Sequence, residues 1–377
     1  MTERIYYLDA LRGILMMGGV LLHAGYVASS GHTWLVSGSG GSIAAYFMVE
    51  IIHYFRMPAF FVVSGFFCLM TLHKYGTEKF LSVRLKRIVI PTITTALTLN
   101  LLQRIFLDEL NSKAFSLRSY FLEGQWDSHL WFLVYLFFYF ILAALFHALT
   151  PLWLVKRVTA FAIPNPNAMA FGMLLALPCF TLVLQGIDST LISLTYDIGG
   201  VIDTYQFLYY IQFFIVGYWL YSHPGVMDAL VRIDIWKLVL TIAVGVGAYA
   251  LWGGGETYLR VAIAEYTRML WVWAAVALCL GLFRRYANGG GKTLRYLSEA
   301  SYTVYLFHHF LVVLIAAVLL HVSTNPLVLL LVTSASAFSI ALAIHHFVVR
   351  RFDWAAYLFN GKVNCQKQPV SLMIAAQ

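Results

Sequence analysis

Two ionisable side chains inside the first apolar stretch of the chain offer the clearest chemistry in the sequence. Arg12 and His23 are separated by ten residues, and eleven helical steps of about 100° return to nearly the same face, roughly 16 Å further along the axis. Histidine titrates near neutral pH, so His23 has the properties of a general base toward a sugar or alcohol hydroxyl. Arg12 is a permanent cation that can hold a phosphate or a thioester carbonyl. The plainer alternatives are buried hydrogen bonding for His23 and, for Arg12, snorkelling to headgroups or pairing with Asp9.

A second polar cluster lies on one sloping face of the next apolar stretch. Glu50, His53 and Arg56 recur at every third residue, and Pro58 follows where a proline would free a carbonyl and kink a helix. Glu50 is expected to orient the His23 ring or to tune its charge, as a third group that holds a catalytic base. The two stretches predict a ladder of polar groups, with one water-accessible cavity shared by both ionisable groups of the first stretch. An ion pair between Glu50 and Arg56 that only joins the two helices is the alternative.

The elements that must position these groups follow from composition. Hydrophobic residues make up 61% of the chain and charged residues 11%, with a mean hydropathy of +0.77, whereas soluble domains carry about 25% charged residues. The sequence predicts an all-α polytopic membrane protein with about ten transmembrane helices of about 20 residues each. The predicted spans are residues 6–28, 44–72, 88–107, 129–149, 168–186, 204–221, 236–252, 263–283, 300–321 and 326–349. Residues 1–350 are expected to form one transmembrane domain and residues 351–377 a cytoplasmic C-terminal tail.

The distribution of positive charge predicts the orientation. With the N-terminus inside, 18 of the 25 Lys and Arg residues fall in cytoplasmic segments, whereas Lys113, Arg118 and Arg260 fall outside. This excess places both termini in the cytoplasm. The formal net charge of +8 is then an insertion signal that needs no nucleic-acid partner, and basic inner loops suit a phosphorylated cytosolic ligand. The four cysteines show neither a disulfide framework nor the spacing of a zinc site.

Five short motifs follow one another along most of the chain. They are Leu8-Asp9-Ala10-Leu11-Arg12-Gly13 followed by His23, then Phe60-Phe61-Val62-Val63-Ser64-Gly65-Phe66, then Arg84-Leu85-Lys86-Arg87-Ile88 ahead of Pro91, then His129-Leu130-Trp131-Phe132-Leu133, and finally Leu297-Ser298-Glu299-Ala300-Ser301-Tyr302-Thr303-Val304-Tyr305-Leu306-Phe307-His308. Any one of them is weak, but five in this order are specific. Through them the chain resembles the acyltransferase-3 family of integral membrane acyltransferases, whose first helix carries an arginine, ten residues and then the histidine. Residues 30–34 and 53–57 are closer to the glucan biosynthesis branch of that family.

This resemblance implies a multi-pass enzyme of the bacterial inner membrane. The implied donor is cytosolic acyl-CoA, and the implied acceptor is a hydroxyl of a periplasmic glucan or another extracytoplasmic saccharide. The branch is associated with succinyl transfer, so succinyl-CoA is favoured as the co-substrate and acetyl-CoA is the alternative, with no bound cofactor and no metal. An acyl group that bears a carboxylate would need an extra cation, for which Arg56 and Arg268 are available. Membrane lipid is the remaining expected partner.

Roles for individual residues also follow from the resemblance. It assigns His23 the role of catalytic base and Arg12 a role on the donor side or in orientation. Ser64 and Gly65 are expected to allow close helix packing at the site, with ordinary packing of small residues as the alternative. Trp131 begins the fourth predicted span at its outer end, where it either borders the site or anchors the helix in the interface.

One face of the ninth predicted span carries a further set of polar side chains. Tyr302, Tyr305 and His308 lie one helical turn apart and rise from a basic surface. This face is expected to line the donor channel, with core packing and tyrosine anchoring as alternatives. The other histidines of the last two spans are expected to be structural; they are His309, His321, His345 and His346.

A second class of function uses the same features without making a bond. In a transporter or flippase for a saccharide or a lipid-linked substrate, the polar ladder would line a pathway. The chain shows no clear duplication of one half in the other, a pattern common in transporters, and this favours the enzyme. An acyltransferase acting on an amine, a lipid or an antibiotic would keep the chemistry and change the acceptor.

Overall fold

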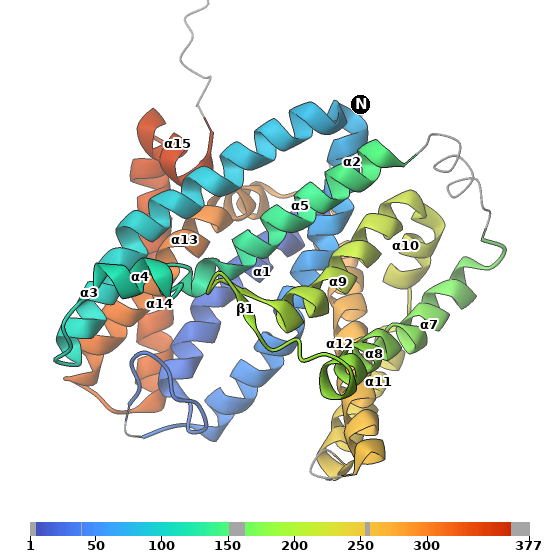
Figure 1. Ribbon diagram of the computed structural model, residues 1–377, viewed down its shortest axis with the longest axis horizontal. Coiled ribbons are helices and arrows are strands. Elements are labelled where there is room, and N and C mark those ends of the chain that lie inside the picture. The colour runs from blue at the N-terminus through green and yellow to red at the C-terminus, as the bar shows by residue number, and fades with distance from the viewer. Residues whose placement is uncertain (1–4, 39, 151–162, 253–256, 363–377) are drawn as a thin grey trace, which may run out of the picture.

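The computed structural model describes residues 5–38, 40–150, 163–252 and 257–362 as a bundle of helices (Figure 1). The elements are α1 (Tyr6–Ala28), α2 (Ile43–Thr95), a π-helical turn (Ala96–Asn100), α3 (Leu101–Leu110), α4 (Leu117–Leu122), a 3₁₀ turn (Ser128–Leu130), α5 (Trp131–Leu149), α7 (Pro166–Ala176), α8 (Pro178–Thr190), β1 (Asp197–Ile198), β2 (Ile202–Asp203), α9 (Thr204–Ser222), α10 (Pro224–Val231), α11 (Ile235–Trp252), α12 (Tyr258–Tyr286), α13 (Lys292–Leu320), α14 (Pro326–Ile344), a second π-helical turn (His345–Val349) and α15 (Asp353–Asn360). The predicted all-α class is confirmed. The one addition is a short antiparallel ribbon of β1 and β2.

The long apolar helices account for the membrane character. Within the described residues, seven helices are long and apolar enough to cross a membrane. One of them, Ile43–Leu110, contains two predicted spans, because the chain turns at Gly76 with a φ of 74° that favours glycine. Gly76 is the one residue of α2 with non-helical dihedrals, so the kink expected at Pro58 does not interrupt the helix. Helices α9 and α11 also fall on predicted spans but lie outside these seven, and the number ten remains a prediction.

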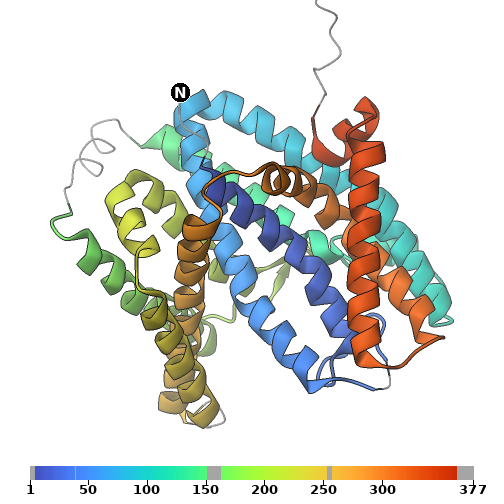
Figure 2. The ribbon, with the colours of Figure 1, turned by 180° about the vertical axis from the view of Figure 1, so that it is seen from behind.

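Helix α1 occupies a central position between α2 and α14 (Figure 2). It also packs along α13, and glycine makes this contact close: a Cβ on Gly13 would lie 2.9 Å from the Cα atom of Ser298. The pair α2 and α9 shows the same feature, because a Cβ on Gly65 would lie 2.0 Å from the carbonyl oxygen of Phe214. Small residues at such contacts let helix backbones approach each other. Glycines therefore fix the position of α1, which carries Arg12 and His23.

Two segments that the sequence presented as extramembrane pieces pack against the bundle. Tyr120 of α4 is fully buried and donates a hydrogen bond to the carbonyl oxygen of Ala96 at 2.5 Å. In the C-terminal segment, α15 packs on α2, and Gly361 follows with a φ of 59°. Residues 353–362 are therefore part of the folded domain. Residues 363–377, and the basic residues Lys156 and Arg157, lie outside the described part of the chain.

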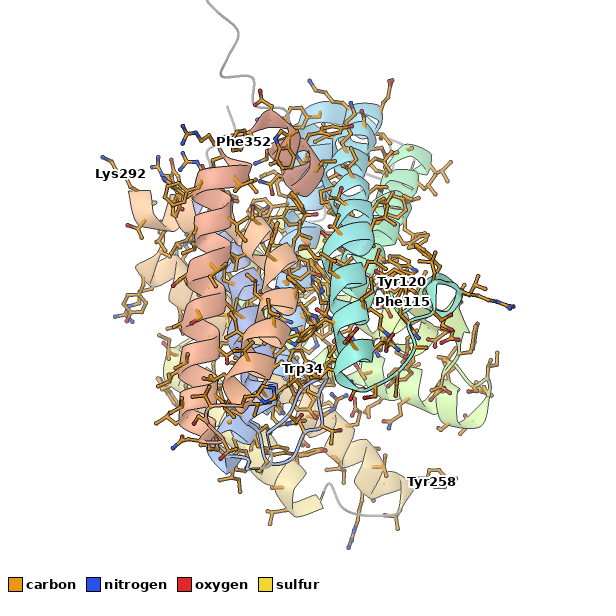
Figure 3. The ribbon with its side chains drawn as sticks, turned by 90° about the vertical axis from the view of Figure 1, so that its left-hand side faces the viewer. Trp34, Phe115, Tyr120, Tyr258, Lys292 and Phe352 are labelled. Carbon is orange, nitrogen blue, oxygen red and sulfur yellow. The ribbon has the colours of Figure 1, made fainter. Side chains whose placement is uncertain are left out.

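The bundle has two distinct ends. The N-terminal end of the chain and α15 lie at the same end in Figure 1. Figure 3 places Lys292 and Phe352 at that end and Tyr258 at the other. Three of the segments that were predicted to share the cytoplasmic side are therefore together, while their assignment to the cytoplasm remains a prediction.

Candidate active site

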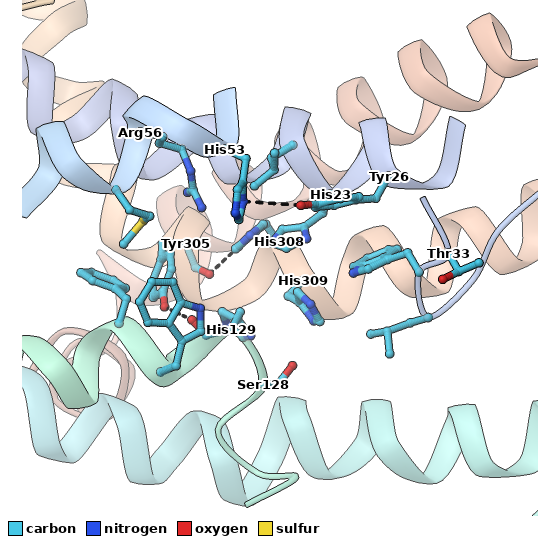
Figure 4. Close-up of a pocket in the computed structure, with 16 residues that line it drawn as sticks. His23, Tyr26, Thr33, His53, Arg56, Ser128, His129, Tyr305, His308 and His309 are labelled. Carbon is cyan, nitrogen blue, oxygen red and sulfur yellow. Dashed lines mark hydrogen bonds between the residues drawn. The ribbon is translucent and has the colours of Figure 1, made fainter. Parts of the chain in front are cut away.

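His23 lies in a cavity of about 470 Å³, referred to here as the histidine cavity (Figure 4). Its walls come from α1, the following loop, α2, the turn before α5, and α13. The lining residues are Leu22, His23, Tyr26, Thr33, Trp34, Leu35, His53, Arg56, Met57, Ser128, His129, Trp131, Phe132, Tyr305, His308 and His309. The His23 ring stacks on the Trp34 indole with 5.2 Å between centroids. The loop after α1 therefore covers one face of the proposed base.

Four of the five imidazole rings that line this cavity lie next to one another. The centroid of His23 lies 4.7 Å from that of His309 and 5.2 Å from that of His308, and His129 lies 4.8 Å from His309. Several of their buried nitrogens have no hydrogen-bond partner among the described residues: Nδ1 of His23, both ring nitrogens of His129, and Nε2 of His308. Buried polar atoms without partners are rare in proteins. Their concentration in one cavity marks it as a site for a polar ligand.

Two of these rings have fixed orientations. The Nδ1–H of His308 donates to the carbonyl oxygen of Tyr305, so in the neutral ring Nε2 is an acceptor. His309 is held by a hydrogen bond of 2.8 Å between its Nδ1 and Oε1 of Gln103. His309 was expected to be structural, and the structure places its ring in the lining of the cavity beside His23. In the sequence, its position directly after His308, which was predicted to be a site residue, could have indicated this placement.

His129 also lines the cavity, although the sequence analysis assigned this residue no role. The hydroxyl of Tyr305 donates a hydrogen bond to the carbonyl oxygen of His129. The residue before His129, Ser128, has a φ of 37°. A non-glycine residue with positive φ is strained, and such strain gathers at functional sites. The signal in the sequence was the motif that begins at His129, of which only Trp131 was given a role. Trp131 does line the same cavity.

Glu50 is placed differently from the expectation. Its Oε1 lies 2.9 Å from Nε2 of His32, whose Nδ1 lies 2.9 Å from the hydroxyl of Ser29. The carboxylate therefore holds the loop after α1 and does not hydrogen-bond to the His23 ring within the described residues. Among these residues no ion pair joins Glu50 to Arg56 either. The sequence missed His32, although it lies in one of the stretches that carried the resemblance.

Arg12 lines a different cavity, of about 300 Å³, referred to here as the arginine cavity. Its described lining residues are Arg12, Met16, Phe60, Ser64, Phe67, Arg84, Arg87, Ile88, Phe132, Leu133, Leu136, Phe140, Ser298, Glu299, Ser301, Tyr302, Asn360 and Lys362. Arg12 forms an ion pair of 3.5 Å with Asp9, as the plainer alternative for it anticipated. Arg84 donates to the Thr71 hydroxyl at 3.2 Å and packs over the Phe140 ring. Four cationic side chains thus border one cavity, at the end of the bundle that holds α15.

The expected single cavity is corrected to two cavities separated by aromatic side chains. Phe132 lines both cavities, Phe60 and Tyr302 line the arginine cavity, and Tyr305 lines the histidine cavity. The Phe132 ring contacts the rings of Phe60 and Tyr305 at centroid distances of 4.8 and 5.1 Å, and Tyr302 stacks on Tyr305 at 6.5 Å. These four residues are called the aromatic partition. Helical spacing placed Arg12 and His23 on one face of α1, but side chains of α2, α5 and α13 fill the space between them.

The other predicted site residues divide between the two cavities. His53, Arg56, Tyr305 and His308 line the histidine cavity, while Ser64 and Tyr302 line the arginine cavity. The predicted face of α13 therefore passes from one cavity to the other, and close helix packing at this point is provided by Gly65.

Comparison with known proteins gives a consistent result along the whole chain. The acyltransferase-3 family model, described as an acyltransferase domain, matches residues 5–346. The glucans biosynthesis protein C of Escherichia coli strain K12 is 29% identical over 382 residues, which cover 96% of this chain and 95% of that protein. The protein of the same name from strain SMS-3-5 has the same identity and coverage. No solved structure matches the chain.

Proposed function

The chain belongs to the acyltransferase-3 family, and on this basis we propose that it transfers a succinyl group from cytosolic succinyl-CoA to a hydroxyl of a periplasmic glucan. Acetyl-CoA is the alternative donor. The name of the relatives, glucans biosynthesis protein C, supports a glucan as the acceptor. The observation that carries the proposal is the arrangement of two cavities of different chemistry on either side of one aromatic layer.

The arginine cavity suits the donor. Acyl-CoA carries phosphates, and guanidinium groups bind phosphate through paired, charge-assisted hydrogen bonds. Arg12, Arg84 and Arg87 line this cavity, with Lys362 at its border. In the proposed orientation it opens toward the cytosol, where acyl-CoA is found. The acyl-pantetheine arm would then pass beside Phe132, the side chain that both cavities share.

The histidine cavity suits the acceptor and the reaction. Tyr26, Trp34 and Trp131 present aromatic faces to it, and Thr33 and Ser128 add hydroxyl groups. A mostly apolar cavity with a few convergent polar groups is typical of a small-molecule site. The His23 ring removes the proton of the acceptor hydroxyl, the oxygen attacks the thioester carbonyl, and the bond between the carbonyl carbon and sulfur breaks. The proton passes from His23 to the departing CoA thiolate, so the ring returns to its neutral form.

Glu50 contributes indirectly in this scheme. It fixes His32, and the Tyr26 ring lies between the rings of His32 and His23, with centroid distances of 5.0 and 6.1 Å. The loop that carries Trp34 is thereby held over His23. We propose that Glu50 positions this loop, in place of the direct contact with the base.

The proposal is tested by following radiolabelled succinyl-CoA with purified protein and a neutral β-glucan. Label should move to the glucan, and His23→Ala should lower the rate by about 10²- to 10⁴-fold, the usual contribution of a general base, while binding of succinyl-CoA is retained. His321→Ala, at an exposed residue beyond α13, is the matched control and should leave the rate unchanged. Label that stays on CoA with the wild-type protein would favour the transporter or flippase, and near-normal turnover of His23→Ala would remove this residue from the base role.

A further inference from the structure

Two arginines inside the bundle differ in whether a carboxylate neutralises their charge. Arg268 makes two hydrogen bonds to the carboxylate of Glu265, so its charge is neutralised within its own helix. Arg56 has no carboxylate partner among the described residues, and its buried Nε atom has no hydrogen-bond partner there. Its Nη1 donates one long hydrogen bond, of 3.5 Å, to the carbonyl oxygen of Leu15. Arg56 lines the histidine cavity, whereas Arg268 lines neither of the two cavities.

A glycine on α1 lets the side chains of Arg56 and His308 approach this helix closely. A Cβ on Gly19 would lie 3.1 Å from Nη1 of Arg56 and 2.9 Å from Nε2 of His308. A cation and an imidazole nitrogen without a partner therefore converge on one point of this helix. Gly19 lies four residues before His23, on the side toward Arg12 and the aromatic partition. This point is therefore on the side from which the acyl group would arrive.

An unpaired guanidinium in a low-dielectric cavity is costly, and an anion that enters the cavity removes that cost. The planar guanidinium matches a carboxylate through two parallel hydrogen bonds. We infer that Arg56 binds the distal carboxylate of a dicarboxylic acyl group while its thioester carbonyl lies at His23. This inference rests on the proposed function and names the residue that selects the donor. Of the two arginines that the sequence offered for this role, the structure favours Arg56.

The distances agree with a four-carbon diacid. Four helical steps lead from Gly19 to His23, a rise of about 6 Å. The two carbonyl carbons of a succinyl group are about 4 Å apart, because three carbon–carbon bonds of about 1.5 Å join them. A hydrogen bond of about 2.8 Å to the guanidinium closes the remaining distance. An acetyl group would leave Arg56 unpaired.

The experiment compares donors with and without a terminal carboxylate on the acyl group. Succinyl-CoA and butyryl-CoA have acyl chains of the same length, with a carboxylate replacing a methyl group, and acetyl-CoA is the short neutral donor. Transfer to a neutral β-glucan, and separately to a phosphorylated glucan, is measured for wild type, Arg56→Gln, Arg56→Lys and the control Arg268→Gln. Binding of each donor is measured in parallel by calorimetry, which needs no turnover. Folding of each variant is checked by its thermal unfolding in detergent.

We expect wild type to bind and use succinyl-CoA at least 10-fold better than butyryl-CoA. Arg56→Gln should lower kcat/KM and affinity for succinyl-CoA by about 30- to 1,000-fold, the usual loss for a buried charged partner, and change those for butyryl-CoA by less than about 3-fold. Arg56→Lys should retain part of the preference, and Arg268→Gln should not change it.

Three results would overturn the inference. Equal losses for all donors would assign Arg56 to the oxyanion or to stability, and a wild-type enzyme without donor preference would show that no carboxylate is recognised. A loss that appears only with a phosphorylated glucan would assign the guanidinium to an anion of the acceptor. A failure of the proposed function would look different, since then no donor would label any glucan.

Discussion

The histidine cavity and the arginine cavity share Phe132 but differ in their polar side chains, which are mainly imidazoles in the first and cations in the second. The first is lined by five imidazoles, and its cation, Arg56, has no carboxylate partner within the described residues. The second is bordered by four cationic side chains from α1, α2 and the C-terminal segment. An uncharged imidazole can accept a proton, whereas a guanidinium can only hold an anion. Under the proposed function, the first cavity carries out the proton transfer and the second binds the phosphates of the donor.

A substitution at Arg12 tests most directly whether the arginine cavity binds only the donor. Arg12→Ala should weaken the binding of acyl-CoA by about 10- to 100-fold, because a charge-assisted contact to the donor is lost, and should leave the KM for the glucan unchanged. Isothermal titration with CoA and initial rates at varied glucan concentration measure the two effects. Arg118→Ala, at an exposed residue of α4, serves as the control. Equal effects on donor and acceptor would instead give Arg12 an orienting role for both.

The C-terminal segment offers a smaller and more specific test of the arginine cavity. Gly361 has a φ of 59°, and a Cβ there would lie 2.2 Å from the carbonyl oxygen of Lys86. Gly361→Ala should therefore displace Asn360 and Lys362, which line the cavity, and raise the KM for acyl-CoA by about 3- to 10-fold, with about 1–2 kcal/mol lost from the free energy of unfolding. The histidine cavity and the KM for the glucan should not change.

Gly247→Ala is the matched control for this substitution, because no atom lies within 4 Å of the added Cβ and its helix is regular. Loss of stability in Gly361→Ala without any change in the KM for acyl-CoA would mean that the C-terminal segment is only a packing element.

The smallest expected effect concerns Asp127, the residue before Ser128, which lines the histidine cavity. Burial raises the pKa of the Asp127 carboxyl from 3.8 to about 7, with the charge of Asp197 adding to the shift. The folded protein thus holds this proton more tightly than the unfolded chain, and the stability that it contributes is lost as the pH rises through about 7. The thermal unfolding midpoint should fall between pH 5 and pH 8, and Asp127→Asn should reduce this fall. Identical pH profiles for the two proteins would contradict the assignment.

The sequence by itself was sufficient for the class of the molecule and for its first helix. Composition requires helices in a membrane, because only regular hydrogen bonding satisfies the backbone there. The period of the helix places Arg12 and His23 on one face of α1, and the five ordered motifs identify the family that the whole-chain comparison confirms. These features are local or additive along the chain, so they can be recognised without knowing which helices are neighbours.

The tertiary structure alone decided what surrounds His23. His129 and His309 come from segments more than a hundred residues away, Glu50 pairs with His32 across the loop after α1, and Phe132 divides the expected single cavity. Such contacts depend on the packing of helices that are distant in the chain, and helical periodicity contains no information about the partner of a face. For this reason the presence of a site was predictable from spacing, whereas its division into two cavities was not.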